Sequence, residues 1–193
     1  MTAAKIAYWY FRLNGFLNIE NFVVHPSIQE LRVQRSQKTE ADLYGVRFPH
    51  RRELDMKDDE PFEGARTNPL FVIAEVTRSQ CKLNGPWVNA ERKNMEYILG
   101  AIGPFPPDRL SEVATSLYKH CIYPHDKGEG CEFRLIAVGK ETNAELQKKY
   151  PDLMQITLVA PQTIGFFAQL VRLFGVAQLN ERDHSQGNRG HRN

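Results

Sequence analysis

Residues 71–78 (Phe-Val-Ile-Ala-Glu-Val-Thr-Arg) constrain the fold of this chain more than any other segment, because an apolar run suddenly turns polar. An almost wholly apolar run of this length is typical of a central strand that is buried on both faces. Residues two apart on a strand point the same way, so Glu75 and Thr77 are expected to project together from its end. The segment therefore predicts a buried strand whose polar end carries functional side chains.

Asp42 supplies a second acid within residues 39–48, another strand-like segment. Aspartate is depleted in strands, so an aspartate in this segment indicates a specific role. Two carboxylates delivered by adjacent strands form a site for a hard divalent cation such as Mg²⁺. The alternative is that Asp42 faces water at a strand edge or bulge, and that Glu75 marks an exposed strand end and pairs with Arg78.

Apolar periodicity and chain breakers predict the remaining elements. Their order indicates an α/β fold with a mixed sheet. The charged segment 50–61 has no periodic apolar pattern and is predicted to be a solvated loop, whereas the turn signal Asn84-Gly85 precedes a helix. Helices are expected at 3–14, 89–100, 108–119, 142–150 and 164–178, and strands at 19–25, 39–48, 70–77, 133–138 and 155–160.

Length and composition indicate a globular protein with one domain, over residues 1–182, followed by a polar tail at 183–193 that is expected to be disordered. The net charge is only +2, so the total charge predicts no strong affinity for nucleic acid, although a local basic patch is compatible with it. The three cysteines are an odd number and favour reduced thiols. No leader pattern or membrane-length apolar run stands out, and a cytoplasmic location is expected.

Asp42 and Glu75, on two strands expected to be neighbours, resemble the acid pair of the PD-(D/E)xK nuclease superfamily. Further blocks, at residues 10–16, 21–26, 41–49 and 83–87, are similar to one group of small bacterial restriction-endonuclease-like proteins of poorly defined function, and the resemblance spans roughly residues 5 to 180. It implies a restriction-endonuclease-like fold, with a three-strand meander, a helical crossover back to the sheet and helices that flank a central mixed sheet. It also implies Mg²⁺ or Mn²⁺ held by Asp42, Glu75 and the carbonyl of Val76, and hydrolysis of phosphodiesters, with DNA as the favoured substrate.

Thr77 departs from the superfamily pattern, which has a lysine at this position. Its hydroxyl can bind a water molecule but carries no positive charge to stabilise a developing phosphorane. Lys82 is the nearest replacement. Two interpretations stay open: an active nuclease that uses Lys82, and a catalytically degenerate nuclease-fold protein that serves as a nucleic-acid-binding or interaction subunit.

Several weaker candidates complete the sequence-based site. Glu20 is a candidate third acid and Gln80 a polar neighbour, although a solvated strand end is the commoner meaning of such a glutamate. A core position is the favoured interpretation of Trp87, with base stacking as the alternative, and solvated faces are the commoner meaning of the basic residues. The candidate nucleic-acid contacts are Arg47, Arg51, Arg52, Arg78, Trp87, Arg92 and Lys93.

His120, Cys121, His125 and Cys131 lie close together in the sequence but match no strong zinc-binding spacing. Ordinary loop and core residues are therefore the favoured interpretation, with structural zinc as the alternative. The apolar helix expected at 164–178 is explained by packing on the sheet, although a homodimer or another protein partner is left open.

Overall fold

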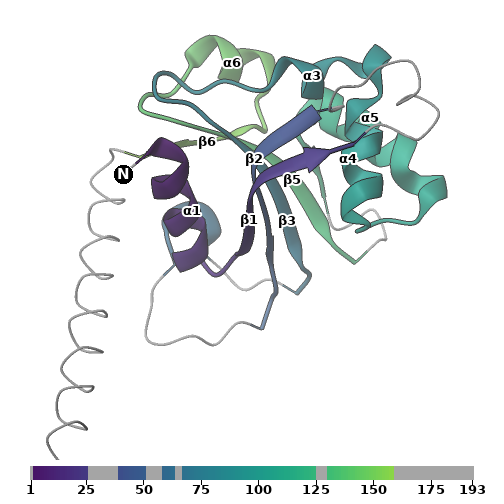
Figure 1. Cartoon of the computed structure of the whole chain (residues 1–193), viewed down its shortest axis with the longest axis horizontal. Coiled ribbons are helices and arrows are strands. Elements are labelled where there is room, and N and C mark those ends of the chain that lie inside the picture. The colour runs from purple at the N-terminus through teal and green to yellow at the C-terminus, as the bar shows by residue number, and fades with distance from the viewer. Residues whose placement is uncertain (1, 26–38, 51–57, 64–66, 125–129, 159–193) are drawn as a thin grey trace, which may run out of the picture. The chain divides into compact units, whose positions relative to one another are not determined.

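A six-stranded mixed sheet organises the part of the chain that the computed structural model describes (Figure 1). The strand order is β1-β2-β3-β5-β4, and β6 also pairs with β5. The β1, β2 and β3 strands form an antiparallel meander, β3 pairs with β5 in parallel, and β5 pairs in parallel with β6 and antiparallel with β4. The strands are β1 (Leu17–Val24), β2 (Thr39–Arg47), β3 (Leu70–Val76), β4 (Ile122–Tyr123), β5 (Glu132–Gly139) and β6 (Met154–Thr157).

The described residues are 2–25, 39–50, 58–63, 67–124 and 130–158. The chain divides into two units, Met1–Leu158 and Val159–Asn193, and every described residue belongs to the first. The helix predicted at 164–178 and the polar tail lie outside the described residues. None of the described helices is long and apolar enough to cross a membrane.

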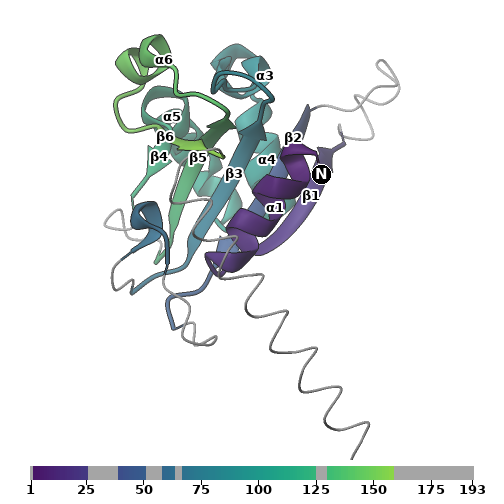
Figure 2. The same ribbon diagram turned by 90° about the vertical axis from the view of Figure 1, so that its left-hand side faces the viewer.

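Helices lie on both faces of the sheet, with α1 on one face and α4 and α5 on the other (Figure 2). The prediction of an α/β fold with a mixed sheet flanked by helices is therefore confirmed. The α-helices are α1 (Ala3–Leu13), α3 (Gly85–Val88), α4 (Asn94–Ile102), α5 (Leu110–His120) and α6 (Ala144–Lys149). Short 3₁₀ helices lie at η1 (Glu60–Phe62), η2 (Ala90–Arg92) and η3 (Pro107–Arg109).

The β3 strand separates two hydrophobic cores, as its apolar sequence predicts. Leu70, Val72 and Ala74 belong to the core beneath α1, while Ile73 belongs to the core beneath α4 and α5. All four side chains are completely buried. The alternation of strand residues thus gives β3 two buried faces, and the first side chain that escapes full burial after Ala74 is Glu75.

The helix predicted at 89–100 begins later, at Asn94. The Asn89 side chain instead caps η2 by accepting the N–H of Glu91, and Lys93 then adopts a left-handed conformation with φ 51°. This local break separates η2 from α4. The unexpected α3 precedes both, and β4 escaped prediction because two residues are too short to show a period.

The solvated loop predicted at 50–61 is exposed at His50, Glu60 and Pro61, but Asp58 and Asp59 depart from the prediction because they are half-buried. Asp58 pairs with the buried Arg47, and Asp59 accepts a hydrogen bond from the hydroxyl of Tyr10. The physical reason is that the neighbouring Phe62 packs in a buried aromatic cluster, which holds Asp58 and Asp59 close to the core. The cluster comprises Tyr10, Phe11, Phe16 and Phe62.

Candidate functional site

The β2 and β3 strands stop pairing at Asp42. Their backbone register runs from Arg47↔Leu70 to Leu43↔Ala74, and β2 then continues beside β1 alone. At this point Oδ2 of Asp42 accepts the backbone N–H of Val76 at 2.7 Å. A carboxylate thus replaces the backbone acceptor that the ladder would otherwise supply, and it fixes the Asp42 side chain between the two strands.

The carbonyl of Val76 faces the same side as its N–H, because both groups of one strand residue project toward the same neighbouring strand. The Val76 N–H points to Asp42, whereas the next N–H, that of Thr77, donates to the carbonyl of Val138 on β5 at 2.8 Å. The Val76 carbonyl therefore lies on the β2 side. A cation held by Asp42 would lie on this side too, so the carbonyl oxygen could serve as a further ligand.

Glu75 lies beside Asp42 and Glu40 at the same place. Partial burial, followed by the negative charges of Asp42 and Glu40, raises the pKa of Glu75 to about 7, and a hydrogen bond from Asn84 opposes this shift. Carboxylates repel one another when they share a partly dry environment, and a hard cation offsets that repulsion. We refer to Glu40, Asp42, Glu75 and Val76 as the acid fork.

Asn84 and Trp87, in the segment that follows β3, form hydrogen bonds with the backbone of the acid fork at Glu40. The carbonyl of Glu40 accepts hydrogen bonds from Nδ2 of Asn84 at 3.3 Å and from Nε1 of Trp87 at 3.1 Å. The sequence predicted only a turn at Asn84 and did not single out Glu40. Strand alternation from Asp42 could have indicated Glu40, whereas no local signal marks Asn84 as a neighbour of Glu75.

Two of the candidate nucleic-acid contacts are structural residues. Trp87 is completely buried, so no face of its indole ring is open to a nucleobase, and the core interpretation holds. Arg47 is 7% exposed, pairs with Asp58 and donates to the carbonyl of Phe62, so its guanidinium is occupied within the fold.

The other basic candidates divide into two sets. Arg78, Arg92 and Lys93 are exposed, whereas Arg51 and Arg52 lie outside the described residues. The exposed Arg78 makes none of the ion pairs found among described residues, so Glu75 does not pair with it.

Thr77 and Glu75, which are expected to project together, have different interaction partners. The Thr77 hydroxyl lies within hydrogen-bonding distance of the carbonyls of Gln80, at 2.9 Å, and Val138, at 3.2 Å, while Glu75 interacts with residues on the β2 side. The reason is that β3 ends at Val76, so strand alternation no longer applies to Thr77. Lys82 is exposed, and the side chain from this segment that reaches Glu75 is Asn84.

The remaining candidates have other partners. Glu20 pairs with Lys5 on α1 at 2.9 Å, and Nε2 of Gln80 donates to the carbonyl of Thr142 at 3.2 Å. Among the described residues, neither side chain forms a hydrogen bond or ion pair with the acid fork.

In the zinc candidate, Cys121 and Cys131 are buried, His120 is exposed near Asp152, and His125 lies outside the described residues. Among described residues no three or more His, Cys, Asp or Glu side chains gather to hold a metal ion. A cation at the acid fork would therefore depend on Asp42, Glu75, the Val76 carbonyl and water.

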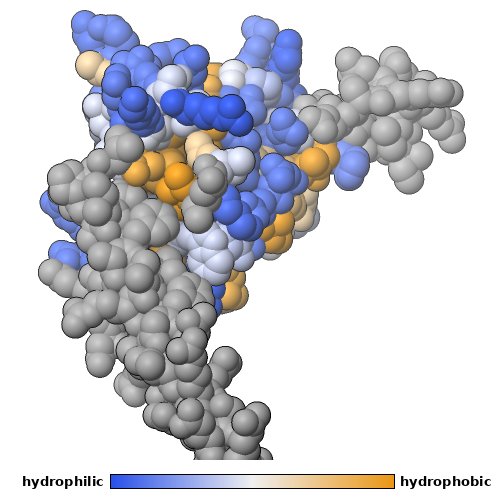
Figure 3. Space-filling view, turned by 60° about the vertical axis from the view of Figure 1, so that its left-hand side comes forward, coloured by the Kyte–Doolittle hydropathy of each residue, from blue (hydrophilic) through white to orange (hydrophobic). Residues whose placement is uncertain are grey.

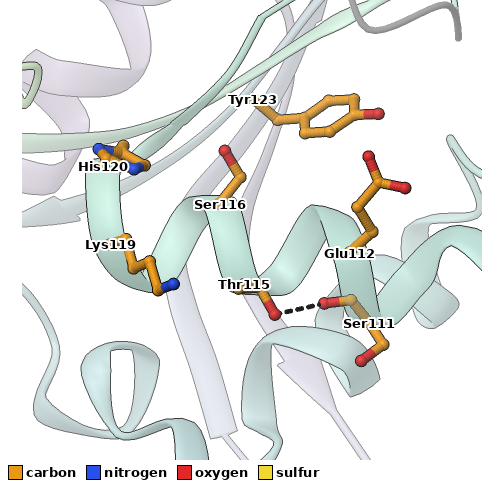
Figure 4. Close-up of a pocket in the computed structure, with 7 residues that line it drawn as sticks. All are labelled: Ser111, Glu112, Thr115, Ser116, Lys119, His120 and Tyr123. Atoms are coloured by element: carbon orange, nitrogen blue, oxygen red, sulfur yellow. Dashed lines mark hydrogen bonds between the residues drawn. The ribbon is translucent and has the colours of Figure 1, made fainter.

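A separate hollow of about 340 Å³ lies over α5 and β4 (Figure 4). Two of its hydroxyls are engaged locally, because Thr115 donates to the carbonyl of Ser111 at 2.8 Å and Ser116 donates to that of Ile122 at 2.7 Å. No residue of the acid fork lines it. Its lining residues are Ser111, Glu112, Thr115, Ser116, Lys119, His120 and Tyr123.

No protein-family model, curated protein or solved structure matches this chain. The fold and the site define its class on their own: an α/β protein with a mixed six-stranded sheet and an acidic opening between its second and third strands.

Proposed function

We propose that this chain is a metal-dependent nuclease with a restriction-endonuclease-like fold, which hydrolyses phosphodiester bonds of DNA with Mg²⁺ or Mn²⁺. The observation that carries the proposal is the hydrogen bond from the Val76 N–H to Asp42, at the point where β2 and β3 separate beside Glu75. The sheet order supports it as well, because a three-strand meander followed by a return to the sheet is the order that the sequence resemblance implies.

The residues of the acid fork would have different roles in binding a cation. Asp42 and Glu75 supply the negative charges, and the Val76 carbonyl supplies a neutral oxygen on the same side. A bound cation would polarise the phosphodiester and lower the pKa of a water molecule for attack. Asn84 favours the ionised form of Glu75, and ionised carboxylates are the form that binds metal ions.

A second candidate function is a catalytically degenerate protein that binds nucleic acid or another subunit without cleavage. The observation that favours it is the environment of Thr77, whose hydroxyl is engaged with backbone carbonyls. The exposed Lys82 offers a cation only if its side chain turns toward the acid fork.

Cleavage of labelled single-stranded and double-stranded DNA and RNA distinguishes these functions. The reactions contain Mg²⁺, Mn²⁺ or EDTA, and they compare the parent protein with Asp42→Asn, Glu75→Gln and Glu20→Gln. We expect metal-dependent cleavage that is lost in the first two variants and retained in Glu20→Gln, since Glu20 pairs with Lys5 instead. A folded parent protein that cleaves none of these substrates would favour the degenerate alternative.

A further inference from the structure

The chain segments that follow β3 and β5 remain side by side beyond the sheet. The N–H of Lys140 donates to the carbonyl of Ser79 at 2.6 Å, and the N–H of Cys81 donates to that of Glu141 at 2.8 Å. At Gly139 an added Cβ would lie only 2.7 Å from the Ser79 carbonyl oxygen. The two segments thus approach so closely that a larger side chain at position 139 would force them apart.

A bulge lies between the two segments that follow β3 and β5, and it contains the exposed Arg78. We call the surface of these two segments the edge. The register pairs Val76 with Val138 and then Gln80 with Glu141, so four steps along the first segment match three along the second. The extra residue falls at the bend formed by Arg78 and Ser79. Such a bulge changes the direction of the side chains that it contains, and here Arg78 is exposed and directly precedes Ser79, whose carbonyl accepts the Lys140 N–H.

Three cations lie on this edge without an acidic partner. Arg78, Lys82 and Lys140 are all exposed, and none of them forms an ion pair in the described part of the chain. Glu141 is the acid on the same two segments. A phosphate group binds exposed guanidinium and ammonium groups of this kind through charge-assisted hydrogen bonds.

The edge adjoins the acid fork along the chain. Arg78 follows Glu75 by three residues, and even a fully extended backbone would separate them by no more than about 10 Å. Figure 1 shows α3 and α6 at the same end of the sheet, and this end is largely hydrophilic in the view of Figure 3. A strand of nucleic acid that runs from the acid fork along the segments after β3 and β5 would pass these cations.

We propose that Arg78, Lys82 and Lys140 form the surface that binds the phosphate backbone of duplex DNA beside the acid fork. The identity of the partner rests on the proposed function, while the position of the surface rests on the joined segments and their unpaired cations. We name these three residues the cationic edge.

The test measures binding without cleavage, by fluorescence anisotropy of a labelled DNA duplex in EDTA. It compares the parent protein with Arg78→Gln, Lys140→Gln and the matched control Lys119→Gln, which removes one exposed charge from α5. Each cationic-edge variant is expected to weaken binding about threefold or more and to lower the slope of log affinity against log salt by about one between about 50 and about 200 mM salt. Lys119→Gln is expected to bind like the parent protein.

The outcomes separate this inference from the nuclease proposal. If the parent protein binds DNA and the cationic-edge variants behave like Lys119→Gln, the edge is wrong while the acid fork is unaffected. A parent protein that binds no DNA overturns the edge and the proposed partner together. If binding changes as expected but the cleavage assay detects no product, the edge stands and the catalytic proposal fails.

Discussion

The carboxylate of Asp42 and the backbone N–H of Val76 are joined by a 2.7 Å hydrogen bond across the point where β2 and β3 stop pairing. The bond gives the Val76 N–H an acceptor at a place where β2 no longer pairs with β3. It also fixes the Asp42 carboxylate beside Glu75. Asp42 therefore has a structural role that is separable from any role of its charge.

Two substitutions at Asp42 separate these roles. Asp42→Ala leaves the Val76 N–H without its acceptor and is expected to lower the free energy of unfolding by about 1–3 kcal/mol. Asp42→Asn keeps an oxygen acceptor and is expected to cost much less, while it still removes the negative charge. Urea denaturation compares the two variants, and equal stabilities would show that the hydrogen bond contributes little.

Glu75 should make stability fall as the pH rises. Its pKa of about 7 in the folded protein exceeds its ordinary value of 4.5, so between these pH values the folded state holds a proton that the unfolded state has released. The free energy of unfolding therefore falls between about pH 4.5 and pH 7 because of Glu75, and this loss is complete above about pH 7. Glu75→Gln is expected to be more stable than the parent protein at pH 8 by about 1–3 kcal/mol, less than full burial would give because Glu75 is half-buried.

The difference between Glu75→Gln and the parent protein should vanish near pH 4, where the parent glutamate is protonated in both states. Denaturation at pH 4 and pH 8 measures it in buffers that contain EDTA. Glu20→Gln is the matched control, because it removes an acid that pairs with Lys5, and no gain at pH 8 is expected. A Glu75→Gln variant that gains nothing at pH 8 would contradict the packing of acids at the fork.

Asn84 is expected to affect metal binding although it supplies no negative charge. Its amide supports the Glu40 carbonyl and favours ionised Glu75, so Asn84→Ala should weaken Mn²⁺ binding by about tenfold or more. Asn89→Ala is the control, because Asn89 caps η2 through the N–H of Glu91. Titration of both variants with Mn²⁺ at pH 7 tests the role, and equal affinities would remove Asn84 from the site.

Thr77→Lys is not expected to restore the lysine of the superfamily pattern. The Thr77 side chain contacts the carbonyls of Gln80 and Val138, whereas Glu75 interacts on the β2 side. The substitution should lose these contacts and cost about 1 kcal/mol in unfolding free energy, with no gain in cleavage. Cleavage assays beside thermal unfolding check both statements, and a large gain in rate would show that the new ammonium reaches the acid fork.

Part of the fold and the closeness of the two acids could be predicted from the sequence because the relevant signals are local. The apolar run of β3 predicted burial on both faces, and the two acids on strands expected to be neighbours predicted that Asp42 and Glu75 lie close together. The resemblance to nucleases stays a prediction. The contact of Asn84 with Glu75 and Glu40 could not be predicted, because it depends on how the segment after β3 crosses from β5 back to β2.

Thr77 shows the limit of a strand pattern. Alternation predicted that Thr77 and Glu75 project together, but β3 ends at Val76, one residue earlier than predicted, and the Thr77 hydroxyl lies within hydrogen-bonding distance of the carbonyls of Gln80 and Val138. Arg47 shows a similar limit, because its charge suggested a surface contact while a distant acid, Asp58, holds it in the interior.

Titration calorimetry of Mn²⁺ binding at pH 8 tests whether Asp42 and Glu75 form a divalent cation site. Glu75 is largely ionised at this pH, so the acid fork is in the form that binds a cation. We expect the parent protein and Glu20→Gln to bind one Mn²⁺ with similar affinity, and Asp42→Asn and Glu75→Gln to lose about tenfold or more. Binding that is equal in all four proteins, or absent from the folded parent protein, would contradict a divalent cation site formed by Asp42 and Glu75.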